Sequence, residues 1–253
     1  MTSLDKITEI ETMASRAWPA QHTQEYGGWL LRAAGGVTRR ANSVLPLHDS
    51  AAETLEVALE YVQRFYQSHK LPVRFQMTKA SHPTDLDSFL ESKGLVIDMP
   101  TKMLTSPLDR MTLEEPEIAI VVFGSPWDDW NSAFGTLTGF DQSTLAIRSD
   151  IINRIPSKKA CAAAIMDQKV IGIGLGVLDG DWLGLFALVT HENFRRQHVA
   201  TSITQSLVSW GLSQGASQAY LQVQEDNVPA QKLYYALGFE DTYSYWYRVA
   251  SEA

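Results

Sequence analysis

The sequence predicts an α/β protein with mixed sheets, arranged as two tandem domains of which the second is complete. Apolar residues at helical spacing alternate along the chain with short strand-like runs. In the first half, strand Val73–Gln76 leads to a helix ended by Gly94 and then to a strand. In the second half, Tyr220–Gln222 leads to a helix ended by Gly238 and again to a strand. This common ending predicts two related domains.

The first domain is expected to span residues 1–112. Helices are predicted where apolar residues recur three and four apart, and strands where apolar runs are bounded by glycine or proline. The expected elements are a helix ending before Pro19, a hairpin of Trp29–Arg32 and Ser43–Leu45, a helix from Asp49 or Ser50, a strand over Val73–Met77, a helix over Thr84–Ser92 and a strand over Leu95–Leu104.

The second domain is expected to span residues 113–253, after a proline- and acid-rich linker at Ser106–Glu117. Its first strand is followed by a helical or irregular region, and then by three strands joined by tight turns. The expected elements are strand Ile118–Phe123, the region Trp127–Ile155, strands Lys159–Met166, Val170–Val177 and Trp182–Thr190, helix His198–Leu212, strand Gln218–Gln224, helix Pro229–Leu237 and strand Glu240–Arg248.

Composition limits the classes of partner. The 29 acidic residues exceed the 21 basic ones, and the net charge of -8 disfavours nucleic acid and anionic membranes. No apolar run is long enough to span a bilayer, and the acidic stretch Met1–Trp18 does not resemble a secretory signal. The lone cysteine, Cys161, favours a reducing compartment, so we expect a cytoplasmic protein. The six histidines show no ligand spacing, so no metal is expected.

A basic segment stands where strand Trp182–Thr190 gives way to a helix. Arg195 and Arg196 lie at the start of that helix, where unpaired backbone N–H groups and a partial positive charge favour an anion. These features predict a phosphate site. Taken alone, the segment fits a solvated basic helix start equally well.

A second motif follows, and together the two segments closely resemble the GNAT superfamily of N-acetyltransferases. The family's phosphate loop reads Arg or Gln, two residues, Gly, one residue, then Gly or Ala, and Arg195 and Ala200 match it. The later signature of Asn, Ala, Leu-Tyr and Leu-Gly-Phe is met in full by Asn227, Ala230, Leu233, Tyr234, Leu237, Gly238 and Phe239. The resemblance covers Ile118–Arg248, and the first half shares architecture alone.

The resemblance implies that acetyl-CoA lies between the strand ending at Thr190 and the strand Gln218–Gln224. The pantetheine arm would pair with strand backbone, the diphosphate would meet the N–H groups of residues 196–201, and Asn227 would fix the arm or the loop beside it. The implied coenzyme-binding residues are Leu188, Val189, Thr190, Arg195, Arg196, Gln197, His198, Val199, Ala200, Thr201, Asn227 and Tyr234.

Tyr234 is the expected general acid. A tyrosine, with an unperturbed pKa of about 10, keeps its proton at neutral pH and can donate it to a departing thiolate of pKa about 8.5. The alternative is a buried aromatic whose hydroxyl is satisfied elsewhere. No general base is identifiable: Glu192, Glu225 and Asp226 are candidates, and a water relay is equally possible.

His198 occupies the position of the family's loop glycine. We expect it to keep an ordinary helical conformation and to add a donor to the phosphate; alternatively, its side chain crowds the site and weakens CoA binding.

The three alternate glycines from Gly172 to Gly176 predict a bent or bulged strand, because no helix follows them as in a nucleotide loop. In the first half, Leu47–Ala51 has no basic residue and Leu90 stands opposite Tyr234, so that copy is not expected to bind CoA.

The resemblance therefore implies an N-acetyltransferase that moves acetyl from acetyl-CoA to an amine of a small molecule or peptide by direct attack, with a degenerate N-terminal copy. The competing hypothesis is a non-catalytic acyl-CoA binding or interaction module. The acceptor and the oligomeric state are left open by the sequence.

Overall fold

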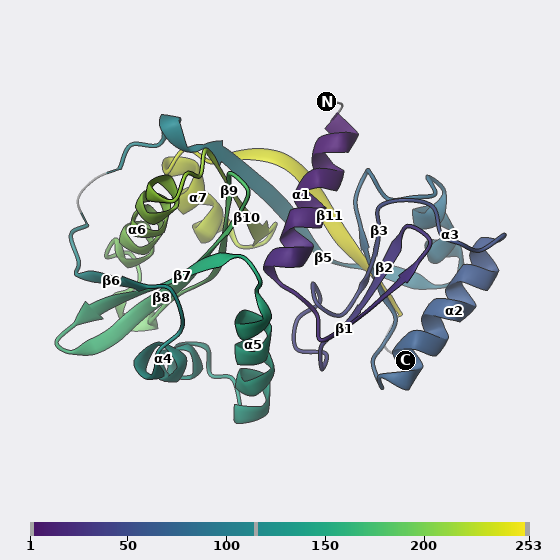
Figure 1. The fold of residues 1–253 in the computed structure, drawn as a ribbon, viewed down its shortest axis with the longest axis horizontal. Coiled ribbons are helices and arrows are strands. Elements are labelled where there is room, and N and C mark those ends of the chain that lie inside the picture. The colour runs from purple at the N-terminus through teal and green to yellow at the C-terminus, as the bar shows by residue number, and fades with distance from the viewer. Residues whose placement is uncertain (1–2, 114–115, 251–253) are drawn as a thin grey trace. The chain divides into compact units, whose positions relative to one another are not determined.

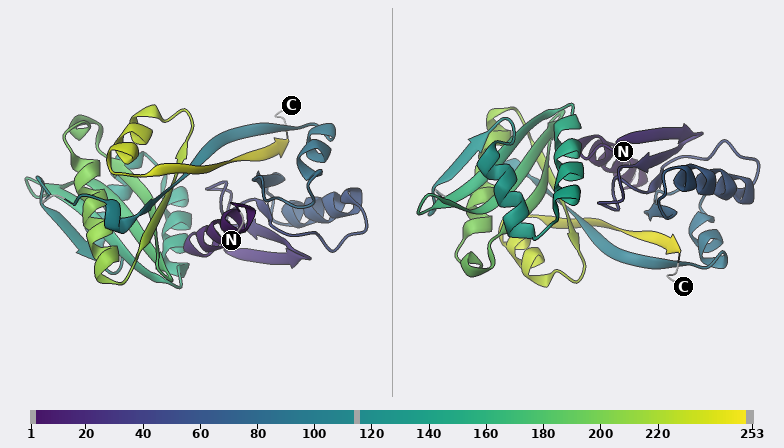
Figure 2. Two further views of the ribbon diagram at one scale, coloured as in Figure 1. Left: turned by 90° about the horizontal axis from the view of Figure 1, so that it is seen from above. Right: turned by 90° about the horizontal axis from the view of Figure 1, so that it is seen from below.

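The computed structural model describes residues 3–113 and 116–250, which form two compact units (Figure 1). The first unit contains Met1–Lys102, Asp150–Arg154 and Tyr243–Ala253, and the second contains Met103–Ser149 and Ile155–Thr242. These bounds differ from a single division at residue 112. Strands β5 (Leu95–Pro107) and β11 (Glu240–Ala250) are long, and each contributes residues to both units (Figure 2).

The described strands form one eleven-stranded sheet, and those of the first unit follow in the order β1-β2-β3-β4-β11. Its elements are α1 (Ser3–Ala17), β1 (His22–Tyr26), β2 (Trp29–Ala33), β3 (Val44–Pro46), α2 (Leu55–Ser68), β4 (Arg74–Met77) and α3 (Leu86–Ser92). The predicted hairpin is confirmed as the antiparallel pair β2–β3, and β1 was not predicted. The predicted start of α2 at Asp49 or Ser50 is wrong, because the side chain of Thr54 caps the helix by accepting from the N–H of Val57.

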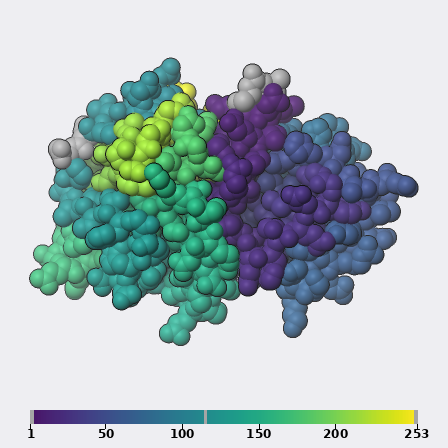
Figure 3. Space-filling view, viewed as in Figure 1, coloured from purple at the N-terminus to yellow at the C-terminus, as the bar shows by residue number. Residues whose placement is uncertain are grey.

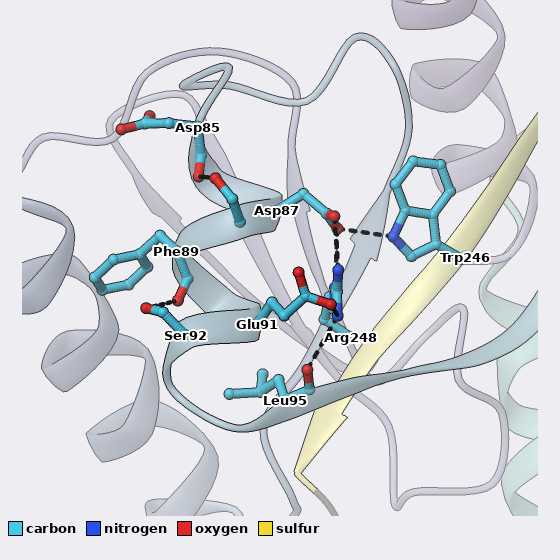
Figure 4. A network of polar contacts seen from close by, with 9 residues as sticks. Asp85, Asp87, Phe89, Glu91, Ser92, Leu95, Trp246 and Arg248 are labelled. Carbon is cyan, nitrogen blue, oxygen red and sulfur yellow. Dashed lines mark hydrogen bonds and ion pairs between the residues drawn. The ribbon is translucent and has the colours of Figure 1, made fainter.

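The end of β11 pairs with β4 in the first unit. Trp246 lies opposite Met77 in an antiparallel pair with β4. Arg248, only 3% exposed, donates to both carboxylate oxygens of Asp87 at 3.0 and 2.7 Å, and also to Glu91 and to the carbonyl of Leu95 (Figure 4). These contacts, with a bond from the Trp246 indole to Asp87, form the C-terminal clamp. They hold the last strand against α3 and explain why residues after 242 belong to the first unit.

In the second unit the strands of the sheet follow in the order β5-β10-β9-β8-β7-β6. Its elements are β6 (Ile120–Phe123), α4 (Asp128–Thr138), α5 (Gln142–Arg154, whose last five residues belong to the first unit), β7 (Lys158–Met166), β8 (Lys169–Asp179), β9 (Trp182–Thr190), α6 (Val199–Ser213), β10 (Gln218–Gln224) and α7 (Val228–Ala236). Figure 1 shows α4 and α6 on opposite faces of β7–β9. The expected linker overlaps the end of β5 and a 3-10 turn at Leu108–Arg110, and its residues 114–115 lie outside the described residues.

Glycines on β8 let α6 approach the sheet closely. A Cβ atom at Gly172 would lie 2.7 Å from Val199 Cγ1, and one at Gly174 would lie 2.7 Å from Ile203 Cγ2. Against β7, Ala164 lies opposite Gly172 and Ile165 opposite Val170, so β8 has one extra residue there and the predicted bulged strand is confirmed. Cys161 lies buried in β7.

Candidate functional site

Strands β9 and β10 begin as parallel neighbours and then separate. Their pairing runs from Trp182 opposite Gln218 to Leu185 opposite Leu221, and no later pair joins them within the described residues. Yet β9 continues to Thr190 and β10 continues to Gln224. The last residues of β9 therefore keep one backbone edge without a strand partner from β10.

A β-bulge in β9 accounts for this separation. Ile173 and Leu175 of β8 lie opposite Val189 and Phe186, so two steps on β8 correspond to three on β9. Ala187, inside this interval, has a φ of 49°, in the left-handed region. Such a bulge bends its strand and increases its twist, which turns the end of β9 away from β10.

The start of α6 follows the end of β9 after one 3-10 turn (Glu192–Phe194). The first N–H to bond into the helix is that of Ser202, to the carbonyl of His198 at 2.9 Å. The preceding N–H groups of Val199, Ala200 and Thr201 thus have no partner within the helix, and His198 supplies no side-chain cap. Arg195 and Arg196 lie exposed beside them. This is an open, positively polarised helix start, and the outer side of α6 lies at the surface of the second unit (Figure 3).

His198 does not have the expected conformation. Its φ of 58° and ψ of 6° are left-handed, so the prediction of an ordinary helical conformation is wrong. Arg196 has a φ of 61° as well, because the chain must turn sharply between the 3-10 turn and α6. A glycine would adopt both angles without cost, whereas a histidine in this region is strained.

The equivalent helix start in the first unit is closed to anions. Thr54 accepts from the N–H of Val57 at 3.3 Å, and Glu56 adds a negative charge to the first turn of α2. A carboxylate there opposes a phosphate, whereas the start of α6 has no acidic residue. The two helix starts therefore differ in capping and in charge.

Helix α7 holds Tyr234 on its inner side. Asn227 caps α7, its Oδ1 accepting from the N–H of Ala230 at 3.3 Å, and Pro229 occupies the first turn. Tyr234 is 8% exposed and packs edge-on against Phe239, with ring centroids 6.0 Å apart. Loss of water around the ring raises the pKa of Tyr234 to about 12. Its hydroxyl stays protonated throughout the physiological range.

Tyr235, the next residue, lies in a different environment from Tyr234. It is 40% exposed, and its hydroxyl donates to Asp241 at 2.6 Å. The two tyrosines thus point to different surroundings, as a quarter-turn between neighbours on a helix requires.

None of the three candidate general bases is a buried carboxylate. Glu192 lies in the 3-10 turn after β9, and Glu225 and Asp226 lie between β10 and α7; all three are exposed. Among the described residues, no group of three or more histidine, cysteine, aspartate or glutamate side chains could hold a metal ion. No helix in the described part of the chain is long and apolar enough to cross a bilayer.

Gln231 was not predicted from the sequence. This residue is buried on α7, three positions before Tyr234, and its amide donates to the carbonyls of Gln224 and Glu225. The sequence did contain a signal for it. Residues three apart share a helix face, so the spacing to Tyr234 places a glutamine on the apolar side of the helix.

Comparison with known proteins gives a consistent result. Residues 4–248 match the family model described as "Probable histone acetyltransferase Rv0428c C-terminal". The "Uncharacterized N-acetyltransferase YobR" of Bacillus subtilis is 32% identical over 251 residues, covering 97% of this chain and 99% of that protein.

Two solved structures share the fold. A GCN5-related N-acetyltransferase from Kribbella flavida superposes with a TM-score of 0.74 at 12% identity, covering 97% of this chain and 96% of its own. A tandem GNAT protein from the clavulanic acid biosynthesis pathway superposes with a TM-score of 0.65 at 12% identity, covering 96% and 88%.

Proposed function

Because the chain belongs to the GNAT family of N-acetyltransferases, we propose that its second unit binds acetyl-CoA and transfers the acetyl group to an amine by direct attack, with Tyr234 as the general acid. The observation that carries this proposal is the open start of α6 beside the separated ends of β9 and β10. A diphosphate needs several donors and positive charge, and residues 195–201 offer both.

The pantetheine arm would occupy the free edge of β9. Leu188, Val189 and Thr190 lie beyond the last β9–β10 pair, so their backbone can pair with an extended amide chain as an added strand does. Asn227 accepts with its Oδ1 to cap α7, and its amide NH2 donates to no described residue, which leaves it for a carbonyl of the arm. Gln197, His198 and the other loop residues would surround the diphosphate.

The transfer needs one attack and two proton movements. The lone pair of a neutral amine forms a bond to the thioester carbon, the carbon–sulfur bond then breaks, and the thiolate takes a proton. The Tyr234 hydroxyl is a permanent donor, because its pKa of about 12 keeps it protonated. It can hydrogen-bond the charge that develops on sulfur. Because apolar surroundings raise the pKa of the hydroxyl and of the thiol alike, this stabilisation of the departing thiolate, and not a favourable pKa difference, is what assists the proton transfer. The proton of the new ammonium leaves to water or to an exposed carboxylate.

The first unit is proposed to be a degenerate copy that does not bind the coenzyme. Its helix α2 has a closed start, and Leu90, fully buried in α3, occupies the place of Tyr234. Similarity of the whole chain to a tandem GNAT protein supports this interpretation. The lone, buried Cys161 is the basis for proposing a cytoplasmic location.

The acceptor is proposed to be an amine on a small molecule or peptide. The net charge of -8 favours a cationic acceptor over an anionic one at long range. A panel of spermidine, lysine and a lysine-containing peptide covers these classes, with thiol release from acetyl-CoA as the measurement.

A thermal melt with acetyl-CoA tests the binding step. A ligand at one hundred times its dissociation constant stabilises the fold by about 2.7 kcal/mol, so the melting temperature should rise with concentration. An unchanged melting temperature at saturating coenzyme would refute the proposal. A rise without thiol release from any amine of the panel would favour the alternative, a non-catalytic acyl-CoA binding module.

A further inference from the structure

The side chain of Gln231 joins helix α7 to the end of β10. Its Nε2 donates to the carbonyl of Gln224 at 3.0 Å and to that of Glu225 at 2.8 Å. Both amide hydrogens are therefore used, and the residue is only 8% exposed. Two bonds from one rigid amide to consecutive carbonyls define both the distance and the orientation of the helix relative to the strand end.

The position of these bonds matters because they join the side chain of a residue within α7 to the end of β10. The helix has nine residues and follows β10 after a short turn. Asn227 accepts from the N–H groups of Ala230 and Gln231, and its own backbone N–H donates to the carbonyl of Gln224 at 3.1 Å. The side-chain amide of Gln231 adds a hydrogen bond from within the helix to the carbonyl of Gln224, the last residue of β10.

Tyr234 lies one turn further along the same face. Residues three apart on a helix are neighbours, and both side chains are 8% exposed on the inner side of α7. The Tyr234 ring is held by packing against Phe239, and its hydroxyl has no hydrogen-bond partner in the described part of the chain. The position of that hydroxyl is thus set by where the helix backbone lies.

We infer that Gln231 is a positioning residue for acetyl transfer, which holds Tyr234 at the place where the thioester sulfur must lie. Gln231 is not one of the signature positions of the acetyltransferase motif, which are Asn227, Ala230, Leu233-Tyr234 and Leu237-Gly238-Phe239. The inference rests on the proposed function for its catalytic consequence, and on the two amide bonds for its geometry. A displacement of about 1 Å at a reacting group can cost about 100-fold in rate.

The test compares Gln231→Met with Gln205→Met. Methionine keeps the length of the side chain and removes both donors. Gln205 is a matched control, because it is 7% exposed in the same unit and its Nε2 donates to the carbonyl of Thr112, away from α7. The measurements are kcat and KM for thiol release with the fastest amine of the panel, the dissociation constant of acetyl-CoA, and the 19F resonance of Tyr234 in fluorotyrosine-labelled protein, assigned with Tyr234→Phe.

We expect Gln231→Met to lower kcat at least about tenfold, with the acetyl-CoA dissociation constant within about twofold of the wild type, and to shift or broaden the Tyr234 resonance. Gln205→Met should leave all three unchanged. A normal kcat and an unshifted resonance in Gln231→Met would overturn the inference, and so would equal losses in both variants.

A second variant guards against a folding defect. Gln231→Glu keeps the shape, and its carboxyl can donate one bond only when protonated, so its rate relative to wild type should recover as the pH falls. A relative rate that does not change with pH would count against the inference. If Tyr234→Phe itself leaves kcat unchanged, the proposed function fails, and the Tyr234 resonance still reports whether Gln231 positions the ring.

Discussion

Substitution of Gly172 by alanine tests how the packing of α6 on β8 sets the coenzyme site. The added Cβ would lie 2.7 Å from Val199 Cγ1, 3.0 Å from Ile203 Cδ1 and 3.2 Å from the carbonyl oxygen of Val189. Carbon atoms pack at about 3.5–4.0 Å, so Val199 must move outward by about 1 Å. Val199 is the first residue of α6, and its movement shifts the N–H groups proposed to bind the diphosphate.

The expected effects can be estimated from these contacts. Overpacking of a filled core costs about 1–3 kcal/mol, which lowers the melting temperature of a chain of this size by about 2–4 °C for each kcal/mol. Partial loss of a bond to a charged phosphate should cost about 1.4 kcal/mol, so acetyl-CoA should bind about tenfold more weakly. Thermal unfolding and calorimetric titration with acetyl-CoA measure the two effects.

Gly176→Ala is the matched control on the same strand. Its Cβ would lie 3.2 Å from Leu183 Cδ1 and 3.3 Å from Leu207 Cδ2, contacts that flexible side chains relieve far from the start of α6. We expect nearly normal acetyl-CoA affinity in this variant. If Gly172→Ala is destabilised but binds acetyl-CoA as tightly as Gly176→Ala does, the start of α6 does not hold the diphosphate and the reasoning is refuted.

Three further predictions concern single side chains. Tyr234→Phe should lower kcat about 100-fold or more with little change in acetyl-CoA affinity, and the wild-type rate should show no loss from ionisation of this residue below its pKa of about 12; an unchanged kcat would exclude it as the acid. His198→Gly should raise the melting temperature, because it removes a left-handed strain of about 1 kcal/mol, and a lower melting temperature would mean that the imidazole makes a stabilising contact. Asp87→Asn should cost about 2–3 kcal/mol in urea unfolding, less than a fully buried pair because Asp87 is partly exposed and Glu91 remains. Hydrogen bonds from Arg248 lower the pKa of Asp87, so its contribution is present above the unfolded pKa of about 4 and is lost as the pH falls through the lowered value; an acid transition identical in Asp87→Asn would contradict this.

Local pattern was sufficient for many of the elements. Strand β10 has the predicted bounds Gln218–Gln224, and α6 begins one residue after its predicted start. Strand β1 was missed because its five residues, His22–Tyr26, are polar or exposed and carry no apolar alternation. Its existence depends on pairing with β2 across Gly27 and Gly28, a contact that propensity does not encode.

The candidate site, like the fold, could be predicted from the sequence only in part. The order of residue types around Arg195 and from Asn227 to Phe239 was enough to identify the family and to predict a phosphate loop, because recognition of a phosphate needs particular donors at a helix start. This order of residue types was not enough to identify Gln231. Its amide comes within hydrogen-bond distance of the two carbonyls only when α7 folds back on β10.

The sequence by itself determined the family, and it predicted the phosphate loop and the residue expected to protonate sulfur, since these depend on residue types at short spacing. Tertiary structure decided where β9 leaves β10, the left-handed conformation of His198, and that the chain's last strand completes the first unit. Each of these depends on hydrogen bonds between strands or on steric limits set by segments distant in the chain, and such constraints exist only after the sheets have formed.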